Sequence, residues 1–154
     1  LTDDEEQMLP TIRSRTQIFQ FKKQVSTLMS QLEEAGLVKN KAKLLAQFSQ
    51  SQTEADKLVH QAGFWALVDE SERLFSWLLA PKKESYLQVA KLTSLADDKE
   101  KQDHVLRILE VLAGQEVLNV SARNILKHLV QARKMWRANV SFQNALEYLV
   151  LQKN

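Results

Sequence analysis

The chain has no cysteine, and only three glycines and two prolines occur among its 154 residues. The absence of cysteine excludes disulfides and thiolate metal sites, and it fits a reducing cytoplasm. The scarcity of glycine and proline removes most turn signals, so long uninterrupted elements are expected. No phosphate-binding loop, nucleophile elbow or zinc-protease motif is present. We therefore expect no metal, no cofactor and no enzyme activity from this chain by itself.

A strong charge of either sign is also missing. The 21 basic and 19 acidic residues give a formal net charge of only +2, too small to indicate nucleic-acid binding from bulk electrostatics. Charged or amide residues interrupt every apolar run well short of the roughly 20 residues that span a bilayer. The first residues are acidic, unlike a secretory signal. We expect a cytoplasmic protein without a membrane segment, and a start at Leu1 rather than methionine suggests a piece of a longer protein.

Apolar residues recur at spacings of three and four through most of the sequence, which predicts an all-α fold. The first such helix covers Lys22 to Ala35 and ends at Gly36, a residue suited to a left-handed helix cap. Two further helices are expected over Asn40 to Gln50 and over Ser51 to Ala62. In the second of these, Ser51 and Glu54 resemble a capping box. Together these three helices predict a small domain over residues 22–63.

Residues 64–154 contain about five helical windows, which predicts a second domain that is a helical bundle. The breaks fall at Pro81, at Asp97, at residues 114–119 and at residues 139–141. Ser121 and Ser141 follow two of these breaks and are predicted to cap the helices after them. The last helix is expected to dock on the bundle, because it carries its apolar residues on one side.

One segment departs from the helical pattern. Residues Thr16 to Phe21 are rich in β-branched and aromatic types, which predicts a β-strand. A lone strand cannot satisfy its backbone groups, so we expect this one to belong to a sheet formed with residues upstream of Leu1. Residues 1–21 would then be the end of a separate domain.

Few residues suggest chemistry by themselves. His60, His104 and His128 have no second ligand at metal-binding spacing, so we interpret them as ordinary surface or boundary residues. Arg133, Lys134 and Arg137 lie close to an aromatic residue, which permits a nucleic-acid patch. The interpretation that we favour is that these cations stabilise the negative end of a helix and that Trp136 belongs to the core with Leu129.

Two segments carry a resemblance to a known family. They are Leu9-Pro-Thr-Ile-Arg-Ser-Arg-Thr-Gln-Ile-Phe-Gln-Phe21 and Ala138-Asn-Val-Ser-Phe-Gln-Asn-Ala-Leu-Glu-Tyr-Leu-Val-Leu151. The first resembles the end of the AAA+ core in bacterial DNA polymerase III clamp-loader subunits, and the second resembles the last helix of their collar domains. The resemblance implies a residual core strand, a three-helix lid over 22–63 and a collar over 64–154. The chain would then be the C-terminal part of a delta-prime subunit.

The same resemblance implies roles for individual residues. Ser14 and Arg15 occupy a Ser-Arg-Cys motif whose arginine reaches the ATP held by a neighbouring subunit, and Thr16 replaces the cysteine. An arginine supplied in trans can raise NTPase rates about 10³- to 10⁵-fold. The window Gln52 to Glu54 lacks the sensor arginine of motor subunits. This favours the non-hydrolysing delta-prime subunit over the gamma/tau motor, which remains an alternative.

The implied partners are gamma/tau and delta, and through the whole complex the sliding clamp and primed DNA. The subunit would thus serve the DNA polymerase III holoenzyme, a DNA-directed nucleotidyltransferase, in DNA replication. We expect the last two helices to hold the assembly together through Leu126, Leu129, Trp136, Phe142, Leu146 and Leu149. A second hypothesis is a stand-alone helical DNA-binding adaptor that uses Lys127 and the Arg133 to Arg137 region.

Overall fold

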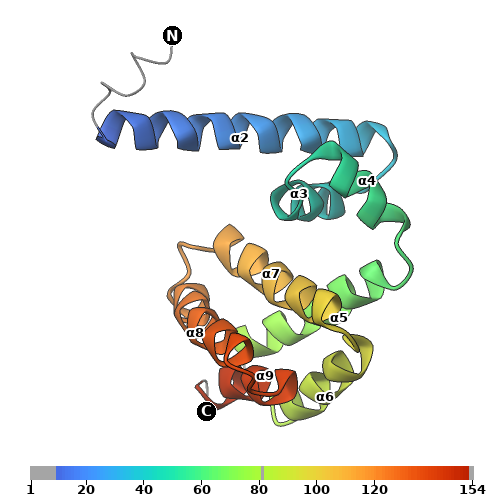
Figure 1. The fold of residues 1–154 in the computed structure, drawn as a ribbon, viewed down its shortest axis with the longest axis vertical. Helices are drawn as coiled ribbons and strands as arrows, with labels where there is room; N and C mark the ends of the chain where they lie inside the picture. The colour runs from blue at the N-terminus through green and yellow to red at the C-terminus, as the bar shows by residue number, and fades with distance from the viewer. Residues whose placement is uncertain (1–9, 81, 153–154) are drawn as a thin grey trace. The chain divides into compact units, whose positions relative to one another are not determined.

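The computed structural model describes the backbone of residues 10–80 and 82–152, and the side chains of residues 21–80 and 82–152. All regular structure in these residues is helical, in agreement with the predicted all-α class. The chain is coloured in order from its N-terminus in Figure 1. The helices are α2 (Pro10–Glu34), α3 (Lys39–Phe48), α4 (Gln52–His60), α5 (Phe64–Leu79), α6 (Ser85–Leu95), α7 (Lys99–Gln115), α8 (Val120–Arg137) and α9 (Phe142–Leu151).

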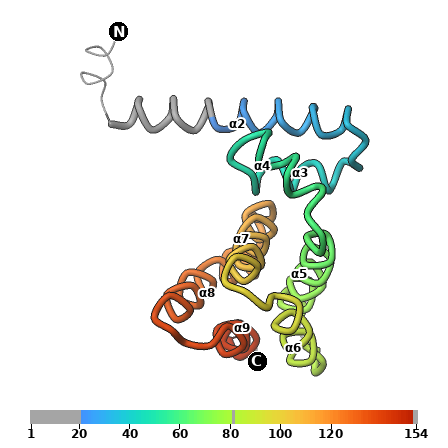
Figure 2. Tube along the Cα trace, turned by 45° about the vertical axis from the view of Figure 1, so that its right-hand side comes forward, coloured from blue at the N-terminus to red at the C-terminus, as the bar shows by residue number. Residues whose placement is uncertain are grey.

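The chain divides into two compact units, residues 1–56 and residues 57–154. The first contains α2, α3 and most of α4, and the second contains α5 to α9 (Figure 2). The boundaries predicted at residues 21/22 and 63/64, and the assignment of the parts as core end, lid and collar, stay predictions. In the described part of the chain, no helix is apolar over a long enough stretch to cross a bilayer.

The strand predicted over Thr16 to Phe21 is wrong for this structure, because these residues continue the helix α2, which begins at Pro10. Proline is favoured in the first turn of a helix, where its missing N–H would have no partner in any case. The described residues contain no other strand for it to pair with, whereas a helix satisfies its backbone groups internally. The local preference of β-branched and aromatic residues is therefore overridden.

Helix α2 ends where the sequence predicted. Gly36 has a φ of 105°, in the left-handed region, and the amide of Leu37 donates to the carbonyl oxygen of Leu32 at 3.1 Å. This bond, together with the left-handed glycine, is the Schellman arrangement that closes a helix. Leu28 and Leu32 are buried on the face of α2 that packs against α3.

The capping box predicted for α4 is present in a slightly shifted form. The amide of Glu54 donates to Ser51 Oγ at 3.1 Å, while Glu54 Oε2 accepts from the amide of Gln50 at 2.7 Å. Two backbone donors at the helix start are thus satisfied by side chains.

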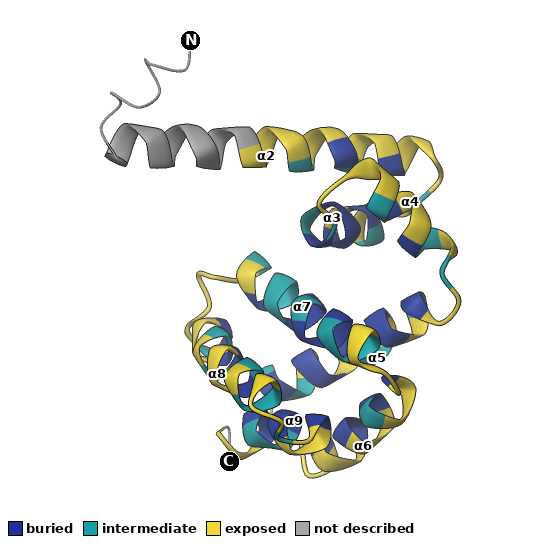
Figure 3. Cartoon of the chain, in the orientation of Figure 1, coloured by how far each residue is buried: buried dark blue, intermediate teal, exposed yellow. Residues whose placement is uncertain are grey.

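The second unit is a bundle in which α7 packs on α5 and α8, and α9 packs on α8 and α6. Its core is made of buried apolar side chains from all five helices. Figure 3 colours the buried residues of these helices dark blue. The five predicted windows therefore correspond to five helices, separated at the predicted breaks. The C-terminal helix is docked on the bundle, as its apolar stripe predicted.

Ser121 and Ser141 were both predicted to cap helices of this unit. Ser141 caps α9, since its Oγ accepts from the amide of Asn144 at 3.1 Å, and that prediction is confirmed. Ser121 does not cap α8. Asn119 does so instead, because its Oδ1 accepts from the amides of Ser121 and Ala122 at 2.8 and 3.4 Å.

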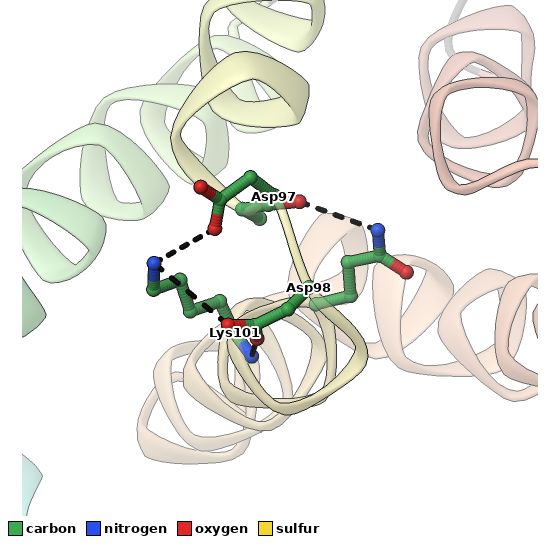
Figure 4. Close-up of polar contacts among 5 residues, drawn as sticks. Asp97, Asp98 and Lys101 are labelled. Atoms are coloured by element: carbon green, nitrogen blue, oxygen red, sulfur yellow. Dashed lines mark hydrogen bonds and ion pairs between the residues drawn. The ribbon is translucent and has the colours of Figure 1, made fainter.

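The corner between α6 and α7 is fixed by charged side chains (Figure 4). Asp98 Oδ1 accepts from the amide of Lys101 at 2.8 Å and so caps α7. The Lys101 ammonium lies 2.7 Å from Asp97 and 3.8 Å from Asp98. The hydrogen bond from Lys101 holds the pKa of Asp97 below its usual value. These contacts set where α7 begins, and α7 in turn positions the face on which α8 packs.

Candidate functional site

Ser14 and Arg15 were predicted to act on a neighbouring subunit. Their backbone belongs to α2, but their side chains lie outside the described residues. The role of Arg15 at the ATP site of a neighbouring subunit therefore stays a prediction.

The residues predicted to hold the assembly together belong to the bundle's own core. Leu129, Phe142, Leu146 and Leu149 are at most 5% exposed, and Leu126 and Trp136 pack partly buried against the same cluster. The sequence correctly placed them on facing sides of α8 and α9, which are in contact. Any part they play in assembly therefore acts through the fold of the bundle.

Arg133 joins α8 to α7. Its Nη1 donates to Asp103 Oδ1 at 2.7 Å, and its Nε donates to Glu110 Oε1 at 2.8 Å. Burial disfavours the charged guanidinium, but the hydrogen bonds to Glu110 and Asp103 outweigh it and raise the pKa of Arg133. Because two carboxylates compensate the positive charge of this guanidinium, it attracts a phosphate group only weakly. Arg133 is therefore a structural residue, which argues against its use in the less favoured nucleic-acid patch.

Trp136 is also used within the bundle. Its Nε1 donates to Gln102 Oε1 at 2.8 Å, and the Lys99 ammonium lies 5.5 Å from the centre of its ring. The indole thus has its hydrogen bond satisfied on α7, and it packs against the core. A base could not stack on this ring without displacing those contacts.

The remaining cations of α8 have a different environment. Arg123, Lys127, Lys134 and Arg137 are exposed, and in the part of the chain that the structure describes they form no ion pair. Arg123 donates to the carbonyl oxygen of Val117 at 3.0 Å through Nη1. The sequence prediction missed Arg123, although its spacing of four residues from Lys127 already put both on one face.

Exposed apolar side chains mark the connection between α7 and α8. Val117, Leu118 and Val120 are 49%, 91% and 61% exposed. They stand within four consecutive residues, and the second is almost wholly in water. Isolated apolar residues at a surface are ordinary, whereas exposed apolar residues grouped together are a feature of contact surfaces.

Glu70 is the polar centre of the contact between α5 and α6. Gln88 Nε2 donates to Glu70 Oε2 at 2.6 Å and to the Glu70 carbonyl oxygen at 2.8 Å. Lys91 lies 3.0 Å and Arg73 3.6 Å from its carboxylate. The hydrogen bond from Gln88 lowers the pKa of Glu70 most, burial opposes it, and Lys91 and Arg73 add to the lowering. This arrangement accounts for Gln88 as a buried polar residue.

The three histidines do not form a site. His104 is buried, with its ring edge-on to Phe64 at 6.0 Å, which differs from the predicted surface or boundary position. His128 is edge-on to Tyr148 at 6.2 Å, and His60 is exposed. Among the described residues, no three potential ligands are grouped so that they could hold a metal ion.

Comparison of the chain with protein-family models, with curated proteins and with solved structures finds no match. The functional interpretation therefore depends on the residues themselves and on the sequence resemblance described above.

Proposed function

We propose that this chain is a non-catalytic assembly module, the C-terminal part of a delta-prime subunit of the DNA polymerase III clamp loader. In this role it joins gamma/tau and delta through its collar, and the whole complex loads the sliding clamp onto primed DNA. The proposed location is the cytoplasm. The alternative within the same complex is a gamma/tau motor subunit.

The observation that carries the proposal is the structure of the C-terminal segment. Residues 138–151 provide one half of the sequence resemblance, and they contain a helix that Ser141 caps and that packs into the bundle. A serine in place of the asparagine of the resembled segment keeps the capping function. The order of elements supports the proposal as well, because three helices precede a bundle of five helices in the described residues.

The helical state of residues 16–21 does not agree with the N-terminal segment of the sequence resemblance. The resemblance implies that these residues form a strand in a sheet with upstream residues, whereas they belong to α2 here. The strand is therefore not part of the proposal, and the role of Arg15 depends on the sequence match of Ser14-Arg15-Thr16 alone.

The exposed apolar group Val117, Leu118 and Val120 is the part of the bundle that we assign to subunit contact. Apolar side chains withdrawn from water contribute roughly 25 cal/mol per Å², and they are enriched at the centre of interfaces. Because these residues lie outside the core, they can be replaced without dismantling the bundle.

The test is reconstitution. The chain is mixed with the gamma and delta subunits of the organism that encodes it, and the mixture is analysed by size-exclusion chromatography with light scattering. We expect a stoichiometric complex, weakened by Leu118→Asn and unaffected by Leu87→Asn, which changes an equally apolar residue that is 71% exposed on α6. No complex with the unaltered chain would contradict the proposal. Saturable ATP binding to the chain would favour a motor function over an assembly module.

The proposed arginine finger has its own test in the full-length subunit. We expect Arg15→Ala to leave the clamp loader assembled but to slow DNA-stimulated ATP hydrolysis and clamp loading, because a cation that stabilises transition-state charge affects rate more than assembly. Ser14→Ala is the neighbouring control for local disturbance. Equal loading rates for the Arg15→Ala and unaltered complexes at saturating ATP would remove Arg15 from this role.

A further inference from the structure

Helix α8 has an unusual charge composition. Its sequence, Val-Ser-Ala-Arg-Asn-Ile-Leu-Lys-His-Leu-Val-Gln-Ala-Arg-Lys-Met-Trp-Arg, contains five Arg or Lys residues and no Asp or Glu. Arg133 is neutralised by Asp103 and Glu110 on α7. The other four cations remain exposed, so the surplus of positive charge faces outward on this element.

The four exposed cations form one line. At about 100° per residue, Arg123, Lys127, Lys134 and Arg137 fall within roughly 80° of one another around the helix axis. At about 1.5 Å per residue, the line extends roughly 21 Å along the axis. We name these four residues the α8 cation line. Asn124 and Gln131 are exposed beside it and add hydrogen-bond donors.

The opposite face of α8 is buried. Ala122, Ile125, Leu129 and Ala132 are at most 2% exposed and anchor the helix in the bundle. The helix is thus anchored in the bundle by one face, while the α8 cation line lies on its exposed face. Its backbone need not fold or reorganise when a ligand arrives, which keeps the entropic cost of binding low.

From this arrangement we propose that the α8 cation line binds the phosphate backbone of a nucleic acid directly, independently of contacts to partner subunits. Phosphates follow one another about every 3.4 Å along each strand of a duplex, so a straight 21 Å line of cations runs beside roughly six steps. Backbone contacts of this kind need charge and hydrogen-bond donors but no base readout. The interaction is therefore not sequence-specific.

Other polyanions fit this surface less well. An amphipathic helix on a membrane inserts its apolar face, but the apolar face of α8 is occupied by the bundle core. An acidic protein surface is normally held by aromatic or large apolar anchors. The exposed apolar group Val117, Leu118 and Val120 lies before the line, and between Arg123 and Arg137 the one exposed large apolar residue is Val130. A regularly charged, rod-shaped polymer requires no such anchor.

The experiment measures binding of a fluorescent 20-base-pair DNA duplex to the 154-residue chain by anisotropy between 50 and 200 mM salt. Four phosphate contacts predict a slope of about −3.6 in the double-logarithmic salt plot, equivalent to an affinity loss of about 150-fold over this range. In Lys127→Gln/Lys134→Gln we expect the slope to fall to about −1.8, with a loss of about 12-fold. The double variant Arg123→Gln/Arg137→Gln should behave in the same way.

The matched control is Lys39→Gln/Lys43→Gln, which removes the same charge from two exposed lysines on α3. It should keep the full slope, and circular dichroism should show equal helicity for all variants. Three results would overturn the proposal. They are an unchanged slope in both α8 double variants, an equal loss of slope in the α3 control, and binding of phosphatidylserine vesicles or polyglutamate that matches or exceeds binding of the duplex at the same salt.

Discussion

Arg133 shows how a single side chain decides the packing of two helices. It is 14% exposed and reaches two carboxylates on α7 that are 35% and 37% exposed. Removing the guanidinium leaves both carboxylates without their shared partner. The resulting loss of stability is larger than the net stabilisation that the intact ion pairs provide. Since the carboxylates still reach water, they can recover part of their solvation.

We expect Arg133→Gln to lower the free energy of unfolding by about 1 kcal/mol, a value reduced for this solvent exposure. Arg137→Gln, on the same helix but exposed, should change it by less than about 0.5 kcal/mol. Urea denaturation followed by circular dichroism measures both. Equal effects would mean that the ion pairs to Asp103 and Glu110 contribute nothing beyond general charge.

Glu70 predicts a dependence of stability on pH. Its pKa is lowered in the folded protein, chiefly by the hydrogen bond from Gln88, so in acid the unfolded state binds the proton more readily. The stabilisation from the carboxylate is therefore present above its unfolded pKa, near 4.5, and is lost as the pH falls through the lower folded value.

Accordingly, Glu70→Gln should be less stable than the unaltered chain by about 1 kcal/mol at pH 7, and the difference should shrink as the pH falls below about 4.5. Asp69→Asn, at an exposed position next to it on α5, is the control and should change the free energy of unfolding at pH 7 by less than about 0.5 kcal/mol. Urea melts at pH 7, 5, 4 and 3 provide the comparison. A constant difference across this series would rule out the proposed linkage to Glu70.

At the level of the elements, Asn119 and Ser121 are two neighbouring residues that differ in their role at the start of α8. The Asn119 side chain satisfies the amides of Ser121 and Ala122, while Ser121 lies inside the helix. We expect Asn119→Ala to destabilise the chain by about 1 kcal/mol and Ser121→Ala to have little effect. Thermal and urea unfolding of the two variants test the assignment. A larger loss for Ser121→Ala would return the cap to the serine.

This example also shows what the sequence could predict. The helices of residues 22–152 follow from apolar spacing, and Gly36 and Ser141 were recognisable as caps because each stands at the end of a clear stripe. Ser121 was predicted as the cap of α8, and Asn119 was not considered. Both residue types cap helices well and they stand two residues apart, so only the backbone conformation distinguishes them. Composition at Thr16 to Phe21 predicted a strand, because local preference cannot say whether a pairing sheet exists.

The candidate sites were predictable to a smaller extent. The carboxylates that neutralise Arg133 lie 30 and 23 residues earlier in the chain, so no local pattern connects them with it. Conversely, Arg123 and Lys127 share a face that helical spacing alone reveals. Helix packing thus determines which cations can bind a ligand. The sequence alone shows which cations lie on one face of the helix.

For the whole molecule, the relevant question is whether the bundle folds without its last helix. Phe142, Leu146 and Leu149 of α9 are buried against α6 and α8. Each large apolar side chain contributes roughly 1.5 to 3 kcal/mol when it is buried, and small domains have only about 5 to 15 kcal/mol in total. Loss of all three, with exposure of the surface that receives them, removes much or all of this margin.

We therefore expect deletion of residues 141–154 to abolish cooperative unfolding of the bundle and, in the full subunit, incorporation into a complex with gamma and delta. Two leucines of α9 provide a finer measurement, because Leu146 is fully buried and Leu151 is 58% exposed. Leu146→Ala should cost about 2 to 5 kcal/mol, whereas Leu151→Ala should cost less than about 0.5 kcal/mol. Unfolding curves and size-exclusion chromatography of the mixed subunits would be recorded for each variant. If the deletion variant still entered a stable stoichiometric complex, α9 would not be required for assembly, and the subunit contacts would have to lie on helices that fold without it.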